Sequence, residues 1–511
     1  MKKFDTIIIG SGHNGLTTAA FLAKKGRKVL VVEKNKTIGG LAASDEFHPG
    51  FKTAGILHDT TAVRRWVTDK LELQKFGLKF HKEHLPVFAP QRSGRGLLLW
   101  RDAKKALEEI GPHSDKDAKN YANYRAFLER ITPFIAKVFD DFPPDVATMS
   151  FPGLWELAKK AVALRMLGRH DMMEILRIGP MCVADWLNEW FESDLLKTMI
   201  CAPALYSTYT GPWSPGSNAN LLIHECFAKE PVIGGPQALV KALEACARAA
   251  GVEIQTNTEV KQLVFDQGRV TGLRLADGSV LSASQVASAI NPKTLFTKLV
   301  DPSELTMSFD DHVRGIRTRG TTGKIHLALS AYPEFAGRPS MKPEYIRTSE
   351  HFDEIEKAFD AIKYREISKI PALDIYVPTL EAPELAPAGK HVMSIMTHFA
   401  PRYLEGGWGE KGRADMYENT VSALEVYAPN IRSLIVGKEV LSPEDLEQRF
   451  GLDEGQLYHV EHAADQLLVR PTYECARYAT PFPGLFLCGS GSHPGGGITC
   501  APGALAVDAM I

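Results

Sequence analysis

Three glycines near the start of the chain have the spacing that binds a pyrophosphate. Gly10, Gly12 and Gly15 form a Gly-x-Gly-x-x-Gly sequence directly after the apolar run 6–9. The first glycine permits a tight turn, the second lets the backbone approach the phosphates, and the third lets the following helix pack on the strand. Free N–H groups at the start of that helix then face the phosphate charge. The residues between the glycines, which we expect to line the same site, are Ser11, His13 and Asn14.

An acidic residue follows at the distance where a dinucleotide ribose is bound. Glu33 lies eighteen residues after Gly15, at the end of a second apolar run, 29–32. Its carboxylate can accept hydrogen bonds from the ribose hydroxyls. A strand, a glycine turn, a helix and a second strand make one βαβ unit. The predicted cofactor-binding residues that continue the unit are Lys34, Gly39, Gly40 and Leu41.

A second glycine-rich loop lies near the other end of the chain. The apolar run 485–487 leads into this loop, and an alanine-rich helix follows from Ala501. A helix N-terminus behind a glycine loop suits a polar or anionic part of the same cofactor, although a purely structural turn is the alternative. We therefore expect both ends of the chain to meet at one cofactor. The predicted cofactor-binding residues here are Gly489, Ser490, Gly496, Gly497 and Ile498.

The segments between these loops predict an interrupted domain. Residues 1–60, 231–300 and 441–511 carry the dinucleotide-binding signals, and the middle part ends in a predicted β-meander. Residues 61–230 are largely helical in pattern, whereas residues 301–440 mix strand and helix patterns. The fold class is therefore α/β, with a Rossmann-like cofactor-binding domain in three parts and an interleaved α+β substrate domain.

Composition limits the function further. The 511 residues are 44% hydrophobic and 23% charged with a formal net charge of −2, so the chain can bury a large core and shows no basic stripe for nucleic acid. The seven cysteines form no CxxC pair, which excludes a thioredoxin-type dithiol and a zinc-finger spacing and favours a reducing compartment. No metal site is predicted. No apolar run reaches the roughly 18 residues of a membrane span. We expect a cytoplasmic protein, and the patterns leave its oligomeric state open.

The two ends together resemble a known family. The sequence through Gly39 and Gly40 resembles the extended FAD fingerprint of the glutathione-reductase-like superfamily, in the branch of amine oxidases, phytoene desaturases and Rab GDP-dissociation inhibitors. The loop 489–497 is similar to the C-terminal signature of phytoene desaturase-like FAD-dependent oxidoreductases, and the likeness extends in order over the whole chain. Ser490 departs from the disulfide reductases, which usually carry an acid there. The resemblance implies FAD as the cofactor, and we place Val260, at the start of the meander, beside it.

The resemblance implies that the flavin itself is the redox group. A hydride from a C–H bond would pass to flavin N5, and oxygen or a quinone would reoxidise the flavin. Such a reaction needs a dry, apolar pocket rather than a nucleophile. The implied substrate is an apolar or amphipathic, isoprenoid-like small molecule that is desaturated or isomerised. The alternatives are a flavin amine oxidase, a weakly catalytic flavoprotein with a regulatory role in respiration, a nicotinamide-binding Rossmann protein, and a prenyl-protein carrier. The presence of Glu33 and the loop glycines makes the carrier unfavoured, because a carrier without a redox role would not need them.

Three further features have both a functional and a structural interpretation. His493 is a candidate catalytic residue that would act as proton donor or substrate orienter, or else a loop histidine bonded to the backbone. Tyr206, Tyr209 and Trp213 could line a pocket, although core packing is the more ordinary interpretation. The segment 154–178 combines helical apolar spacing with basic residues. It fits peripheral contact with a membrane surface, or a lid packed on the substrate domain, which we favour.

Overall fold

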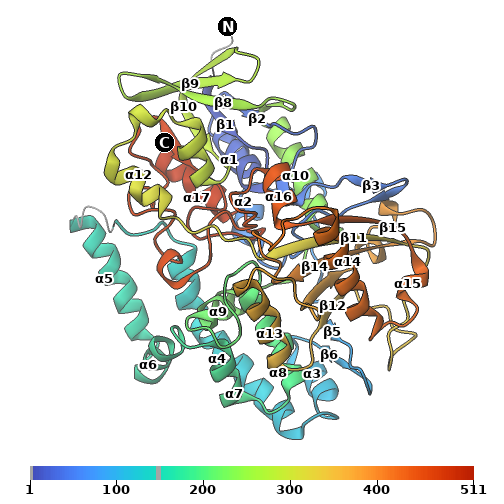
Figure 1. The fold of residues 1–511 in the computed structure, drawn as a ribbon. Coiled ribbons are helices and arrows are strands. Elements are labelled where there is room, and N and C mark those ends of the chain that lie inside the picture. The colour runs from blue at the N-terminus through green and yellow to red at the C-terminus, as the bar shows by residue number, and fades with distance from the viewer. Residues whose placement is uncertain (1–3, 146–150) are drawn as a thin grey trace.

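Two seven-stranded β-sheets organise the chain, which a computed structural model describes over residues 4–145 and 151–511. Figure 1 shows one sheet in the upper part of the molecule, built from blue, green and red segments, and the other at the lower right, mostly in orange. Helices in cyan and green form a third region below and to the left of the first sheet. Each sheet therefore collects strands from distant parts of the sequence.

The first sheet is the expected Rossmann-like one. Its strand order is β7-β2-β1-β10-β9-β8, with β16 also paired to β10. β1 pairs in parallel with β2 and β10, and its residues Ile7, Ile8 and Ile9 are buried, as in parallel sheets covered on both faces. The strands are β1 (Phe4–Ile9), β2 (Val29–Val32), β7 (Glu253–Gln255), β8 (Val260–Asp266), β9 (Arg269–Leu275), β10 (Val280–Ser288) and β16 (Leu485–Leu487).

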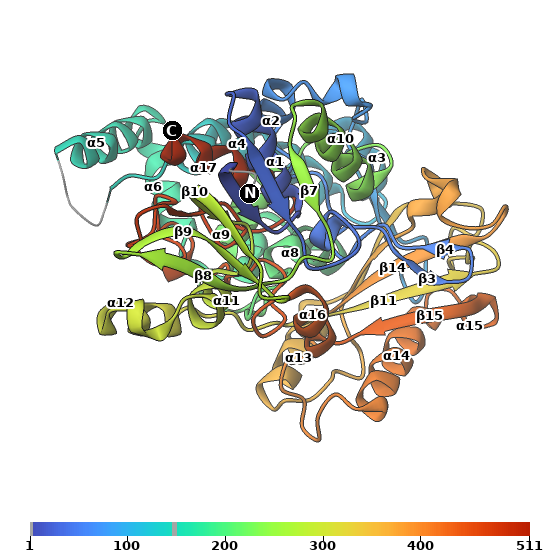
Figure 2. The same cartoon turned by 90° about the horizontal axis from the view of Figure 1, so that it is seen from above.

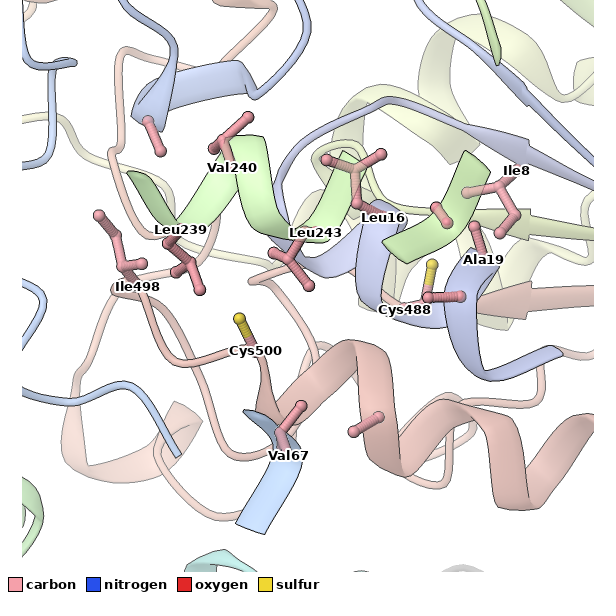
Figure 3. Close-up of a cluster of buried hydrophobic side chains, with 14 of the residues drawn as sticks. Ile8, Leu16, Ala19, Val67, Leu239, Val240, Leu243, Cys488, Ile498 and Cys500 are labelled. Atoms are coloured by element: carbon pink, nitrogen blue, oxygen red, sulfur yellow. The ribbon is translucent and has the colours of Figure 1, made fainter. Parts of the chain in front are cut away.

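Three helices from different parts of the chain share one apolar core on this sheet. They are α1 (His13–Lys24), α10 (Gly235–Ala249) and α17 (Ala501–Met510). Figure 3 shows Leu16 of α1 and Leu243 of α10 in the same cluster as Ile498, which precedes α17. α17 approaches α1 so closely that a Cβ atom on Gly503 would lie 2.2 Å from the backbone oxygen of Asn14. The last helix is therefore packed directly on the first.

The second sheet is mostly antiparallel. Its order is β15-β11-β14-β13-β12-β5-β6, and β11, which pairs with β15 and β14, is buried along its whole length. The stretch 61–230, expected to be largely helical, contributes β5 and β6 to one edge. This pairing joins residues far apart in sequence, so the local pattern did not reveal it. The strands are β5 (Val87–Ala89), β6 (Leu97–Leu99), β11 (Thr322–Leu329), β12 (Tyr345–Thr348), β13 (Leu373–Tyr376), β14 (His391–His398) and β15 (Ile435–Leu441).

Most of the remaining helices form two groups. One group lies in the stretch 61–230, and α5 and α6 of this group lie at the outer edge of the molecule in both views (Figures 1 and 2). Across the described residues, no helix is long and apolar enough to cross a membrane. The helices of the stretch 61–230 are α2 (Arg65–Lys70), α3 (Ala103–Ile110), α4 (Asp115–Phe139), α5 (Phe151–Met166), α6 (Arg169–Ile178), α7 (Val183–Trp190), α8 (Asp194–Leu205) and α9 (Ser217–Phe227).

The other group, beside the second sheet, comprises α13 (Phe352–Lys363), α14 (Glu410–Glu425), α15 (Ile431–Leu434) and α16 (Pro443–Phe450). Two further parts of the chain have regular structure. One is a short hairpin of β3 (Glu46–His48) and β4 (Phe51–Lys52), and the other contains the helices α11 (Pro292–Thr294) and α12 (Met307–Arg314).

Candidate cofactor and substrate site

The first glycine loop leaves open space at one position. Gly12 caps the N-terminus of α1 with φ −63° and ψ 169°, and a Cβ atom added there would meet no described atom within 4 Å. At Gly15, by contrast, a Cβ atom would lie 2.1 Å from the backbone oxygen of Gly10. The space beside Gly12 is thus a cradle at a helix N-terminus, which is what a pyrophosphate requires.

Glu33 holds this loop at the end of β2. Its buried carboxylate accepts hydrogen bonds from the backbone N–H and the hydroxyl of Ser11, at 2.9 and 2.8 Å, and from the N–H of Asn35 at 2.9 Å. A carboxylate has about four acceptor positions, so room remains for a ribose hydroxyl. The acid therefore both fixes the glycine loop and can bind the sugar.

The second glycine pair lies against the first loop. The Gly39 N–H donates to the Ser11 backbone oxygen at 3.1 Å, and a Cβ atom on Gly40 would lie 3.3 Å from the Gly12 Cα atom. Leu41 is half-buried against the apolar core of α1. These three predicted residues are thus brought together with the phosphate loop.

Two predicted residues lie at the margin of the site. The Lys34 side chain is exposed, and Val260 is half-buried in β8. The chain just before Val260 does border the ribose acid, because the Thr258 N–H donates to the backbone oxygen of Glu33 at 2.8 Å. The roles of Lys34 and Val260 at the cofactor stay predictions.

The two ends of the chain meet at the helix N-terminus. The side-chain amide of Asn14 donates to the Ser490 hydroxyl at 3.0 Å, and the Thr18 hydroxyl donates to the Gly503 backbone oxygen at 2.8 Å. His13 lies close to the Gly497 backbone, and burial lowers its pKa to about 4. His13 Nε2 and Asn14 Oδ1 are buried without a partner among the described residues. The junction therefore offers free polar atoms to a bound cofactor, and the residues fit one.

Crowding explains the glycines of the C-terminal loop. A Cβ atom on Gly489 would lie 2.6 Å from the Ala289 backbone oxygen, and one on Gly496 would lie 2.2 Å from the Tyr458 Cβ atom. The Gly496 N–H donates to His462 Nε2 at 3.0 Å. Gly497 and Ile498, the other predicted residues of this loop, line a cavity described below.

A buried arginine lies behind this loop. Arg470 is fully buried, and its Nη2 donates to the Val460 backbone oxygen at 2.8 Å, but Nη1 has no partner within the described chain. A Cβ atom on Gly495 would lie 2.6 Å from that Nη1 atom. Burial lowers the pKa of Arg470 to about 9. The positive charge of Arg470 would therefore stabilise a negatively charged group on the other side of the loop. The sequence did not reveal this role.

His493 does not line the chamber, although Phe139 and Pro494 beside it do. Its ring is buried and stacks parallel to Phe139 at a centroid distance of 6.1 Å. Burial, and then Arg470, lowers its pKa to about 3. His493 is not among the residues that line the cavities, whereas its neighbour Pro494 is. The catalytic role of His493 stays a prediction, and this packing gives it no support.

Three adjoining hollows lead away from the C-terminal loop. We call the hollow at the loop the chamber, which has about 970 Å³ of empty space when its open side is included. We call the next hollow the passage and the outermost one the mouth. The chamber is walled on one side by the loop 494–499. The residues shared by chamber and passage are His58, Asp59, Tyr206, His224 and Asp374. Those shared by passage and mouth are His84, Trp100, Arg101, Glu225 and Ala228.

The chamber is not the apolar pocket that we expected. His58 Nε2 donates to Asp374 at 2.9 Å, Arg347 Nε donates to the same carboxylate at 3.1 Å, and Lys324 Nζ donates to His58 Nδ1 at 3.2 Å. Burial lowers the pKa of Lys324 to about 7. Burial alone would raise the pKa of Asp374, but His58 and Arg347 hold it well below its usual range. A charged network therefore borders the chamber. Lys324 is a charged residue within the mostly apolar strand β11. Nothing else in the sequence indicated that it belongs to the site.

The predicted aromatic patch separates into three environments. Tyr206 is buried and lines the chamber. Tyr209 packs edge-on against Phe359 at 5.8 Å, and Trp213 is 43% exposed. Only the first of the three predicted residues therefore reaches the site.

The cysteines provide no second redox group. All seven lie in the described part of the chain, and each is buried and unpaired. Burial raises the pKa of both Cys488 and Cys500, which flank the C-terminal loop, to about 12. These thiols are therefore protonated at neutral pH and unreactive. The described residues also contain no cluster of side chains that could hold a metal ion.

Comparison with known sequences assigns the family. Residues 15–506 match the profile described as "Flavin containing amine oxidoreductase", and the chain belongs to this family. It is therefore an FAD-dependent oxidoreductase, and the expected cofactor and enzyme class are confirmed.

Individual relatives confirm the desaturase-like branch. The chain is 32% identical to rat "Pyridine nucleotide-disulfide oxidoreductase domain-containing protein 2", covering 98% of this chain and 92% of that protein. It is 24% identical to the "4,4'-diapolycopene oxygenase" of a Methylomonas species, covering 96% and 94%. It is also 24% identical to the "zeta-carotene-forming phytoene desaturase" of Myxococcus xanthus, covering 96% and 90%.

Solved structures confirm the fold class. An oxidoreductase from Methanosarcina mazei superposes with a TM-score of 0.61 at 17% identity, covering 100% of this chain and 99% of that one. Cyclohexylamine oxidase from Brevibacterium oxydans gives a TM-score of 0.58 at 14% identity, with the same coverage. The α/β FAD-binding fold thus matches the one predicted.

Gly12→Val should abolish retention of FAD while the apoprotein stays folded. Valine adopts these backbone angles and has free space there, but its side chain would fill the cradle that the phosphates need. The measurements are the flavin absorbance of purified protein and the melting temperature of the apoprotein. Gly409→Val is the matched control, because Gly409 caps α14 with φ −67° and ψ −169° and also faces open space. A Gly12→Val protein as yellow as the control would contradict the loop assignment.

Glu33→Ala should weaken FAD binding by about 1–3 kcal/mol, the size of a lost charge-assisted hydrogen bond. This corresponds to an increase of about 5- to 150-fold in Kd, measured by titrating apoprotein with FAD and following flavin fluorescence. Ser11→Ala removes one of the loop's bonds to the same carboxylate but leaves the acid in place, so it should raise Kd less. Equal Kd values for wild type and Glu33→Ala would exclude Glu33 as the ribose acid.

Proposed function

We propose that the protein dehydrogenates an amphipathic small molecule and passes the electrons to oxygen or a quinone. The observation that carries this proposal is the chamber, which has the C-terminal glycine loop as one wall and opens through a passage toward the surface. A substrate in the chamber would lie beside the loop that meets the helix N-terminus. The named desaturase and oxygenase relatives support the reaction class.

The residues of the chain would divide the work between binding and proton control. Bound FAD supplies the acceptor for a hydride. The loops at Gly12 and 494–499 hold the cofactor, and the chamber holds the substrate beside the second loop. Lys324, with a pKa of about 7, can take up or release a proton near neutral pH, and His58 links it to Asp374. The network can therefore hold the proton that a dehydrogenation releases.

A flavin amine oxidase is the second candidate, because one observation favours it. The resemblance to the amine oxidases implies a lysine and a cage of aromatic side chains beside the flavin, and neither could be identified in the sequence. The structure has the buried Lys324 bonded to His58, which lines the chamber. The family description also names amine oxidoreductases. The aromatic stack at the chamber pairs Tyr206 with His398 at 4.9 Å, so it contains a single tyrosine rather than a cage of two.

An anaerobic screen should separate these functions. Oxygen-free holoprotein is mixed with isoprenoid alcohols, isoprenoid hydrocarbons or primary amines, and the flavin absorbance is followed. We expect bleaching by members of the isoprenoid series and none by the amines. Bleaching by amines alone would establish the amine oxidase, and a flavin that no compound reduces would favour the regulatory role.

The sequence pattern favoured a packed lid for this segment, but large apolar side chains of α5 and α6 are exposed. We therefore also propose that the α5–α6 face contacts a membrane surface. Its exposed basic residues Lys159, Arg165 and Arg169 complement anionic lipid headgroups. Next to this face lies an open hollow that shares Pro133 of α4 with the mouth. Contact here would bring the mouth near the lipid. The large apolar side chains exposed on the face are Phe151, Leu154, Trp155, Val162, Met166, Met173 and Leu176.

Vesicle sedimentation should detect this contact. Protein should pellet with phosphatidylcholine vesicles that contain phosphatidylglycerol, and Met166→Glu should reduce the bound fraction several-fold, because a charge enters the apolar face. Met307→Glu is the matched control, since Met307 is 83% exposed and Met166 81%, but Met307 lies on α12. Equal binding of both variants, or no binding of the wild type, would contradict the proposal.

A further inference from the structure

One tyrosine hydroxyl is buried without a partner at the point where several hollows meet. Tyr206 lines the chamber, the passage and a third recess beside them, as does Asp374. Tyr206 is 6% exposed, and its hydroxyl, which lies near the Asp374 carboxylate, makes no well-formed hydrogen bond in the described part of the chain. A buried hydroxyl is nearly always bonded. A ligand in the hollow would supply the missing bond.

The neighbours of Tyr206 fix its ring in place. His398 stacks on it at 4.9 Å with an interplanar angle of 11°, and the Arg347 guanidinium lies 5.5 Å from its centroid. Burial lowers the pKa of His398 to about 4, so this histidine is neutral. A second polar atom without a partner among the described residues, Asn220 Oδ1, belongs to a residue that lines the chamber. The hydroxyl is therefore a pre-positioned donor and acceptor.

Charged groups of both signs surround this point. Asp374 is already paired with Arg347 and hydrogen-bonded to His58, and Lys324 lies behind His58. An ammonium group would meet the positive charge of Arg347, whereas a carboxylate would meet Asp374 and Asp59. An uncharged hydrogen-bonding group fits without an unpaired charge.

The route to this point is also polar. Arg101 and Arg125 both form ion pairs with Glu225, and Arg101 and Glu225 line the passage and the mouth. A pure hydrocarbon would gain no hydrogen bonds along this route, whereas a molecule with a polar head and an apolar body suits it.

We propose that the substrate carries an uncharged oxygen group, a hydroxyl or a carbonyl, which hydrogen-bonds to Tyr206 at the junction of chamber and passage. This inference rests on the proposed function and narrows its substrate class from apolar or amphipathic molecules to oxygenated amphipathic ones. A hydrocarbon such as a polyene would offer the Tyr206 hydroxyl no hydrogen bond.

Matched ligands test the proposal. Holoprotein is titrated with geraniol and farnesol, with hydrocarbons of the same carbon skeletons, and with the corresponding amines, and binding is read from the perturbation of the flavin absorbance band. An alcohol should bind about tenfold tighter than its hydrocarbon and its amine, as one added hydrogen bond allows. Tyr206→Phe should remove this preference and leave hydrocarbon binding unchanged.

A second tyrosine provides the control. Tyr376 is also fully buried, and its hydroxyl, which lies near Glu344, makes no well-formed hydrogen bond among the described residues. Unlike Tyr206, it does not line the chamber, the passage or the recess. Tyr376→Phe should therefore keep the preference for alcohols. The wild-type preference is measured without any variant, so poor folding of Tyr206→Phe would not remove the test.

Several results would overturn the proposal. They are equal or tighter binding of the hydrocarbon or the amine, absence of binding by either alcohol, and a preference that persists in Tyr206→Phe. Each leaves the proposed function standing if the holoprotein still contains FAD and a substrate reduces it. Holoprotein whose flavin no compound reduces would instead count against the proposed function.

Discussion

The direct packing of the last helix on the first is the constraint on which the site depends. Gly503 of α17 leaves no room for a side chain against Asn14 of α1, and Asn14 in turn holds Ser490 through its side-chain amide. Asn14 and Ser490 are 476 residues apart in the sequence. Their hydrogen bond fixes the two glycine loops at one helix N-terminus. Because the apolar core in Figure 3 is shared by α1, α10 and α17, any loosening of this core would separate the two halves of the cofactor site.

The second sheet gives the site its chemical character. Its strands β11, β13 and β14 carry Lys324, Asp374 and His398 toward the residues of the cofactor-binding domain. The result is a chamber that combines apolar walls with a network of buried charges of both signs, rather than an apolar cavity. Buried ion pairs are poor stabilisers, so their presence here is better explained by substrate recognition or proton control than by stability.

The cofactor loops could be predicted from sequence because their residues are neighbours in the chain. The Gly-x-Gly-x-x-Gly motif, Glu33 and the C-terminal glycines each follow a buried strand at fixed spacing, so local pattern was sufficient. Lys324, Arg470 and the pairing of His58 with Asp374 could not be found in this way, since His58 and Asp374 are 316 residues apart. The edge strands β5 and β6 were missed for the same reason. His493 was a candidate because of its position in the loop, but packing against Phe139 decides where its ring lies.

We infer that both ends of the chain hold one FAD. Denaturing the purified native protein and measuring the coenzyme in the supernatant tests this inference. We expect FAD close to one molecule per chain. A colourless supernatant, and a protein that takes up no flavin when refolded with excess FAD, would contradict the convergence of the two loops on a cofactor.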